Sequence, residues 1–128
     1  MNIAVTEGIQ VVVETYYNAA FSDPKLNHYL FGYKIFISNL GTDPVKLLDR
    51  HWDIVDGTGF IREVDGPGVI GLQPLIQPNT TFSYESACDL TTPVGNMSGY
   101  YFMRNLGTRE RIQVQIPLFI MEVPWLLN

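Results

Sequence analysis

The sequence predicts an all-β protein, a single domain spanning residues 1–128 and built as an antiparallel β-sandwich of about seven or eight short strands. Short runs of valine, isoleucine, tyrosine and phenylalanine recur along the chain, and each is bounded by Gly, Pro, Asn or Asp. No segment keeps the helical spacing of apolar residues through three turns. The connections, roughly two to six residues long, suit antiparallel hairpins rather than parallel crossovers. Because several runs are apolar on one side only, we favour a sandwich over a barrel.

The N-terminal half contains four predicted strands in which apolar and polar side chains alternate. Alternation places one apolar face against a core, because successive side chains of a strand point to opposite sides. It is unbroken in the second strand, from Tyr29 to Ile37. In the third strand, Leu48, Trp52 and Ile54 are expected to face the core. These four strands are Ile9–Tyr17, His28–Ser38, Val45–Val55 and Phe60–Val64.

The C-terminal half contains four more predicted strands. Pro74 and Pro78 interrupt the first of them, so it belongs at an edge or a crossover. The third is apolar on both faces. In the last, Ile116, Leu118 and Ile120 are expected to share the buried face. These four strands are Val69–Leu75, Thr80–Cys88, Met97–Met103 and Arg111–Ile120.

The composition indicates a folded protein with little attraction for nucleic acid. Apolar residues make up 46% of the chain and charged residues 16%, the opposite of a disordered composition. Eight basic and thirteen acidic residues give a net charge of −5, whereas a general nucleic-acid binder needs a broad basic face. No apolar stretch approaches the roughly 20 residues of a membrane-spanning helix, and the N-terminus lacks the features of a signal peptide. We therefore expect a cytoplasmic protein without nucleic-acid binding or membrane insertion.

Gly66, Gly68 and Gly71 have the G-x-G-x-x-G spacing of dinucleotide-binding loops. In those sites the loop leads into a helix whose N-terminal amides bind a pyrophosphate. Here Pro74 and Pro78 follow and prevent a helix. We therefore predict that the glycines shape a connection between strands, with nucleotide or pyrophosphate binding as the weaker alternative, and we expect no cofactor.

The odd-numbered face of the third predicted strand carries candidate metal ligands. His51 and Asp53 lie two residues apart, roughly 6.5 to 7 Å along a strand, so both could flank one divalent ion. Asp56 in the adjoining turn completes the candidate set. Asp49 could extend it, as could His28 if the second strand lies alongside. The alternative interpretation is an ordinary polar face exposed to solvent.

The chain shows no group of residues that indicates a catalytic mechanism. It has two histidines in all and lacks a G-x-S-x-G nucleophile motif. Cys88, the only cysteine, lies on the apolar side of its predicted strand, so we expect it in the core. A single cysteine also excludes an intramolecular disulfide. We predict that the protein is not an enzyme.

Two aromatic segments are more apolar than the core of a sandwich requires. Tyr100 and Phe102 lie opposite the apolar face of their strand, and Trp125 follows Pro124 near the C-terminus. Either these segments cover each other or they form an exposed patch of the kind found at protein interfaces. Tyr100, Phe102 and Trp125 are therefore candidates for an interaction surface.

Three segments occur in the order and spacing of the ApaG signature: HWDIVDG at 51–57, GPGVIGLQP at 66–74 and FSYES at 82–86. The sequences IPLF at 116–119 and VP at 123–124 also resemble the end of that family, so the resemblance extends from about residue 9 to residue 127. One departure is Pro78-Asn79, where the family usually has Pro-Gly. Asn tolerates the left-handed conformation better than most residues, so we expect the turn to persist.

The resemblance to the ApaG family implies an immunoglobulin-like or fibronectin type III-like β-sandwich. Bacterial ApaG, also called CorD, is linked to cobalt resistance and magnesium efflux. Related domains occur in a eukaryotic F-box protein and in a DNA-polymerase-delta-interacting protein. The family supplies no established catalytic residues, and it implies a non-enzymatic protein-interaction domain with unidentified protein partners or a second copy of the chain. Direct binding of Mg²⁺ or Co²⁺ is the first alternative.

Overall fold

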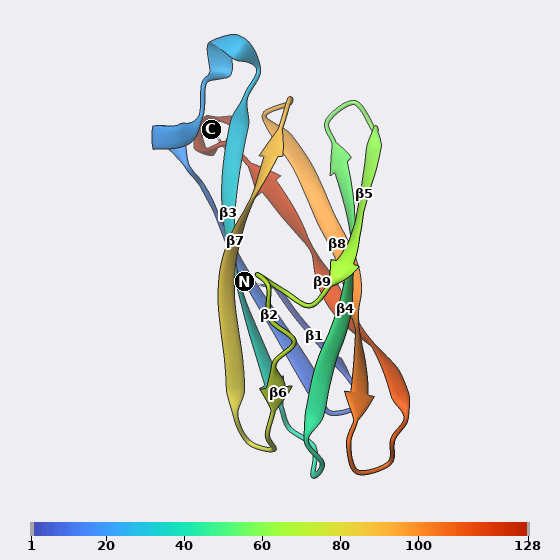
Figure 1. The fold of residues 1–128 in the computed structure, drawn as a ribbon. Helices are drawn as coiled ribbons and strands as arrows, with labels where there is room; N and C mark the ends of the chain where they lie inside the picture. Colours follow the sequence, from blue (N-terminus) through green and yellow to red (C-terminus); the bar gives the residue numbers. More distant parts are fainter. Residues whose placement is uncertain (1, 128) are drawn as a thin grey trace.

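Two antiparallel β-sheets, packed face to face, make up the computed structural model, which describes residues 2–127 (Figure 1). The strands are β1 (Asn2–Thr6), β2 (Ile9–Tyr17), β3 (Tyr29–Asn39), β4 (Val45–Asp56), β5 (Ile61–Pro67), β6 (Leu75–Ile76), β7 (Thr81–Leu90), β8 (Val94–Asn105) and β9 (Arg111–Glu122). One sheet has the order β1-β2-β3-β7 and the other β5-β4-β8-β9, with β6 also paired to β4. Short 3-10 helices are η1 (Ala19–Phe21), η2 (Pro24–Leu26) and η3 (Pro124–Leu127).

This architecture confirms the predicted all-β, fibronectin type III-like sandwich. Strands β2-β3-β7 face strands β5-β4-β8-β9, and β1 extends the first sheet at its edge. β1 was not among the predicted strands. It forms a hairpin with β2 through Glu7 and Gly8, which both have positive φ angles of +47° and +79°. Those angles define the type I′ turn that suits two-residue hairpins.

The strand predicted at Val69–Leu75 is wrong. Val69 and Leu72 instead exchange two backbone hydrogen bonds of 2.8 Å around Ile70 and Gly71. Both central residues have positive φ angles, +43° and +77°, as in a type I′ turn. The chain then runs on to the two-residue strand β6, so the apolar residues of this segment belong mainly to a tight turn.

A β-bulge in β4 changes which side chains of that strand face the core. The register between β4 and β8 shifts between Leu47 and Asp49, so one extra residue is inserted into β4. Leu47 is fully buried, whereas Leu48 is only half-buried. The prediction for Leu48 was therefore wrong, while Trp52 and Ile54, beyond the bulge, are buried as predicted.

A second irregularity has the same effect in β9. The register between β8 and β9 shifts where β8 passes from Met97 to Gly99. Phe119 consequently points into the core, with 1% of its surface exposed, while Leu118 and Ile120 are 51% and 50% exposed. The prediction that Leu118 and Ile120 face the core was wrong, because the alternation reverses after the bulge.

The core lies between the inner faces of the two sheets. An aromatic group at its centre joins Tyr33 of β3 to Trp52 and Phe119 of the opposite sheet, with ring centroids 5.5 to 6.0 Å apart. Burial of such rings is a large stabilising contribution. The hydroxyls of Tyr84 in β7 and Tyr101 in β8 form a buried hydrogen bond between the sheets. Burial raises the pKa of both phenols, so both stay neutral.

The two sides of the sandwich are closed differently. On one side β1 lies against β9, where Asn2 Nδ2 donates to the carbonyl of Leu118 at 2.6 Å and the Gln115 amide donates to Thr6 Oγ1 at 3.1 Å. On the other side the edge strands β5 and β7 face each other with few direct contacts, and a cleft opens between them. Within residues 2–127, no helix is long and apolar enough to cross a membrane.

Candidate functional surfaces

His51 lies on the outer face of the β5-β4-β8-β9 sheet, between two carboxylates. Its Nδ1 is 2.6 Å from Asp65 Oδ1 on β5, and its Nε2 is 3.0 Å from Asp53 Oδ1 on the same strand. Asp65 reaches His51 because the β4-β5 register places the two residues directly opposite each other. The hydrogen bond to Asp65 raises the pKa of His51, desolvation lowers it, and Asp53 raises it further. The protonated imidazole can donate to both carboxylates.

The predicted metal ligands are only partly brought together. One ligand atom each from His51, Asp53 and Glu63 lies within 4.8 Å of the others. Asp53 and Glu63 are opposite each other across β4 and β5, a like-charge pair that a cation would relieve. Glu63 was not predicted, because its position depends on the register of the β4-β5 hairpin.

Asp56 lies outside this group. Its Oδ1 accepts hydrogen bonds from the amide and hydroxyl of Thr58, at 2.8 and 2.6 Å, and from the Phe60 amide at 3.2 Å. These bonds, that from the Thr58 hydroxyl above all, lower the pKa of Asp56. The side chain therefore organises the turn after β4. His28 precedes β3, which belongs to the other sheet, so the second predicted strand does not run beside His51.

Tyr100 and Phe102 share the outer face of the sheet with His51, and other side chains cover both. The rings of His51 and Tyr100 stack with centroids 4.8 Å apart and an interplanar angle of 19°. The Arg111 guanidinium lies over the Phe102 ring, 3.9 Å from its centroid, and is 3.7 Å from Asp49 Oδ2. Both aromatic side chains are half-buried as a result. They form a polar-aromatic surface rather than an exposed apolar patch.

Trp125 belongs to a different region, one end of the sandwich. Its ring packs edge-on against Tyr17 at the end of β2, with centroids 5.5 Å apart, yet the residue is 50% exposed. The η3 segment that carries it lies at the same end of the sandwich as the loop containing η1 and η2 (Figure 1). That end also carries Phe21, Leu26 and Leu126, which are 71%, 76% and 44% exposed. We call these residues, with Trp125, the apolar end.

The glycine-rich loop is organised by contacts within the protein. The Gly68 amide donates to the Leu48 carbonyl at 2.8 Å, and the amides of Val69 and Leu72 are used in the type I′ turn. Gly68 has a φ of +60°, and a Cβ there would collide with the Leu72 carbonyl oxygen. No helix follows the loop before β6. The amides of Gly68, Val69 and Leu72 are thus used within the protein, whereas a dinucleotide site presents the amides of its loop and helix N-terminus to the phosphates.

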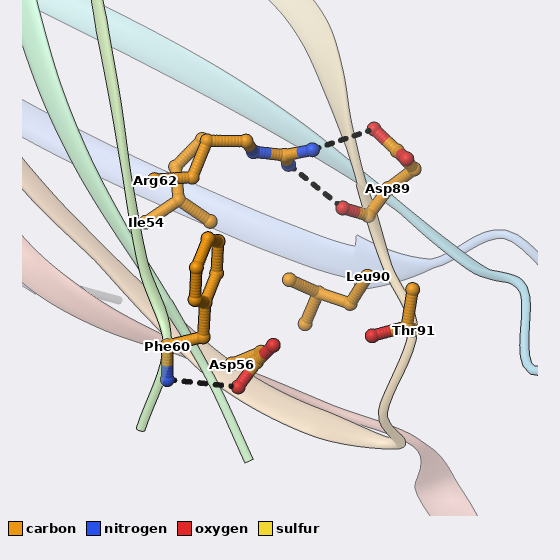
Figure 2. A pocket seen from close by; sticks show the side chains of 7 residues that line it. All are labelled: Ile54, Asp56, Phe60, Arg62, Asp89, Leu90 and Thr91. Atoms are coloured by element: carbon orange, nitrogen blue, oxygen red, sulfur yellow. Dashed lines mark hydrogen bonds and ion pairs between the residues drawn. The ribbon is translucent and has the colours of Figure 1, made fainter. Parts of the chain in front are cut away.

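A cleft between the β5 and β7 edges was not predicted. At one end, a pocket of about 230 Å³ is lined by side chains of β4, β5, the β4-β5 turn and the end of β7 (Figure 2). Arg62 Nη2 donates to the Asp89 carbonyl at 2.9 Å, and its Nη1 is 3.5 Å from Asp89 Oδ1. The neighbouring space, about 340 Å³, is lined by residues that include Arg50, Tyr33 and Ser86. No sequence motif marks this space, because its residues come from five separate strands.

The fold and these surfaces define a small fibronectin type III-like domain with a polar cleft between its sheets. A family model described as the ApaG domain matches residues 19–105. Protein ApaG of Brucella anthropi is 45% identical over 121 residues, covering 94% of this chain and 92% of that protein. Protein ApaG of Rhizobium meliloti is 45% identical over 125 residues, covering 98% and 95%.

Solved structures agree with the sequence relatives. The crystal structure of a Bordetella pertussis protein assigned the name ApaA matches with a TM-score of 0.88 and 39% identity, covering 91% of this chain and 94% of that one. The chain belongs to the ApaG family. The turn at Asn79 adopts the left-handed conformation expected from the sequence, with a φ of +61°.

Proposed function

We propose that this domain is a non-enzymatic protein-interaction module that binds its partner through the apolar end. The observation that carries the proposal is the group of exposed large apolar side chains there, Phe21, Leu26, Trp125 and Leu126. Large apolar side chains gathered in one region of a folded protein are typical of binding surfaces, and tryptophan is enriched among residues that dominate binding energy. Trp125 is also held in place by Tyr17, which lowers the entropy lost on binding.

The apolar end is a better candidate than Tyr100 and Phe102. His51 and Arg111 already cover those two rings, so a partner would first have to displace a stacked histidine and a cation-π contact. At the apolar end, half or more of the surface of Phe21, Leu26 and Trp125 is in contact with solvent. Burying it against a protein surface yields roughly 25 cal/mol per Å² of apolar area.

The test is affinity capture from a native bacterial lysate, with the variant carrying Phe21→Ser and Trp125→Ser beside the wild type. We expect the wild type to capture a specific partner, and the double variant to capture at least tenfold less of that partner. Leu75→Ser is the matched control, because Leu75 is also 50% exposed but lies in β6, away from this end (Figure 1). Circular dichroism verifies that each variant folds.

Two further outcomes of this comparison decide whether the apolar end binds a second copy of the chain or binds no partner. If the wild type sediments as a dimer and the double variant as a monomer, the partner is a second copy of the chain. If both proteins are monomeric and capture the same partners equally well, the apolar end is not the binding surface and the proposal is wrong.

A second candidate function is direct binding of a divalent cation, favoured by the convergence of His51, Asp53 and Glu63. Calorimetric titration with Mg²⁺ and with Co²⁺ separates the two metals, and the imidazole ligand favours Co²⁺. We expect Glu63→Gln to weaken Co²⁺ binding about tenfold or more, and Asp56→Asn to leave it unchanged because Asp56 serves the turn. Equal loss in both variants, or the absence of binding below millimolar concentrations, would rule out this site.

A further inference from the structure

Arg50 is a charged residue on the inner face of β4. The absence of a side chain at Gly66 leaves space for the Arg50 guanidinium near the edge of the sandwich. The two residues are opposite each other in the β4-β5 register. A Cβ on Gly66 would lie 2.9 Å from Arg50 Nη1 and 3.2 Å from its Cζ, too close for an ordinary contact. Because position 66 has no side chain, the guanidinium can lie over β5 at Gly66, and Arg50 lines the cleft.

The glycine-rich loop then fixes the guanidinium in place. Arg50 Nη1 donates to the carbonyls of Pro67 and Gly68, both at 3.0 Å. Among the hydrogen bonds formed by residues 2–127, none uses Arg50 Nε or Nη2. No buried side-chain nitrogen or oxygen of the described chain lacks a partner, so neither of these donors is fully shielded from solvent. The outer donors of a rigidly held arginine are therefore available at the cleft.

The cleft that Arg50 lines has the size and chemistry of a small ligand site. Its volume is about 340 Å³, at the small end of the range for ligand pockets. Tyr33 and Ser86 line the opposite wall, which belongs to the other sheet, and Trp52, Val64 and Met97 supply apolar surface. Burial raises the pKa of Tyr33, while a hydrogen bond with Ser86 and, to a smaller extent, the charge of Arg50 act in the opposite direction.

The other charged groups of the cleft largely neutralise each other. Arg62 donates to Cys88 Sγ at 3.4 Å and to the Asp89 carbonyl, and pairs with the Asp89 carboxylate. Arg50 has no carboxylate within ion-pair distance among the described residues. Its charge is therefore the one in the cleft that a bound anion would balance.

We propose that the Arg50 guanidinium and the hydroxyls of Tyr33 and Ser86 form a binding site for a small anion, a carboxylate or a phosphate, in the cleft between β5 and β7. The planar guanidinium can donate two parallel hydrogen bonds to such a group. The glycine-rich loop contributes by holding the arginine with its carbonyls. The anion has two conceivable sources, a free small molecule or the terminal carboxylate of an extended peptide lying between the edge strands.

The test is an NMR titration that follows the Arg50 Nε–Hε signal of the full chain. The probes are succinate, inorganic phosphate, the peptide Ala-Val-Ala-Val with a free carboxylate, and the same peptide with a C-terminal amide. We expect saturable shifts with at least one carboxylate or phosphate probe and none with the amide. Binding by succinate or phosphate identifies a free anion, whereas binding only by the acidic peptide identifies a chain terminus.

Matched variants distinguish binding at this site from nonspecific attraction of the anion to the positive charges of the protein. We expect Arg50→Gln to weaken binding at least tenfold, and Tyr33→Phe and Ser86→Ala to weaken it a few-fold. Arg111→Gln removes the same charge from the outer face of the sheet and should have no effect. If Arg50→Gln does not fold, the two hydroxyl variants decide the question. Binding that Arg111→Gln weakens as much as the cleft variants do, or no shift with any probe at 20 mM, overturns the proposal.

Discussion

The two carboxylates that hold His51 make this residue sensitive to pH. Its pKa is raised in the folded protein, chiefly by Asp65, so the protonated form is favoured by folding. The stabilisation is fully present below the pKa of the unfolded chain, about 6.5, and is lost as the pH rises through the higher folded value. Above that pH the two carboxylates face a neutral ring.

Thermal unfolding of the wild type and of His51→Gln at pH 5.5 and pH 8.5 measures this effect. We expect the wild type to lose about 2 to 5 °C more than the variant over that interval, because a partly exposed ion pair contributes roughly 0.5 to 1 kcal/mol. Screening by 1 M NaCl should reduce the difference. Parallel behaviour of the two proteins at both pH values would show that folding does not raise the pKa of His51.

At the scale of single residues, the sequence could place His51 and Asp53 together but not their third neighbour. Two residues separated by one on a strand share a face whatever the strand pairs with. Glu63 and Asp65 join them only through the register of the β4-β5 hairpin, which the turn at Gly57-Thr58-Gly59 determines. Asp56 was assigned to the metal set because the sequence does not show that Thr58 and Phe60 would occupy its carboxylate.

At the scale of elements, the glycine-rich loop contains two glycines that differ in how much space surrounds them. Both Gly68 and Gly71 have positive φ, but only at Gly68 would a Cβ meet the backbone, at the Leu72 carbonyl. We expect Gly68→Ala to lower the free energy of unfolding by about 2 kcal/mol or more. Gly71→Asn should cost at most about 1 kcal/mol, because Asn accepts this conformation and the space is open. Urea denaturation measures both, and equal losses would contradict this account of the loop.

The elements themselves were largely predictable, and their irregularities were not. Alternation identified the long strands because it reflects burial directly. Bulges at Leu48 and near Leu118 add one residue and reverse the pattern. The first has no signal in the local sequence, whereas Pro117 beside Leu118 is a residue that strands accept at edges and bulges. β1 was missed because a five-residue edge strand with both Ile3 and Val5 exposed carries little periodic information. The Val69–Leu75 segment is apolar, yet Ile70 occupies a turn position that favours Gly or Asn.

At the scale of the whole molecule, the hydrogen bond between Tyr84 and Tyr101 ties one sheet to the other through the core. Replacing either tyrosine by Phe leaves the other hydroxyl buried without its partner, which costs roughly 1 to 3 kcal/mol. The double replacement loses the bond but leaves no orphaned group. We therefore expect the double variant to lose less stability than the sum of the single variants, by about 1 kcal/mol. Additive losses in urea unfolding would show that the two hydroxyls do not depend on each other.

The placement of Arg50 over Gly66 has a consequence for how sequences of this family can diverge. A side chain at position 66 is disfavoured by the guanidinium that rests there, and not by the local backbone, since Gly66 is not among the residues with positive φ. A relative with a small residue in place of Arg50 is released from that constraint and can accept alanine or serine opposite it. We therefore expect positions 50 and 66 to vary together among relatives, whereas the glycine at 68 is required by its own positive φ and by the Leu72 carbonyl.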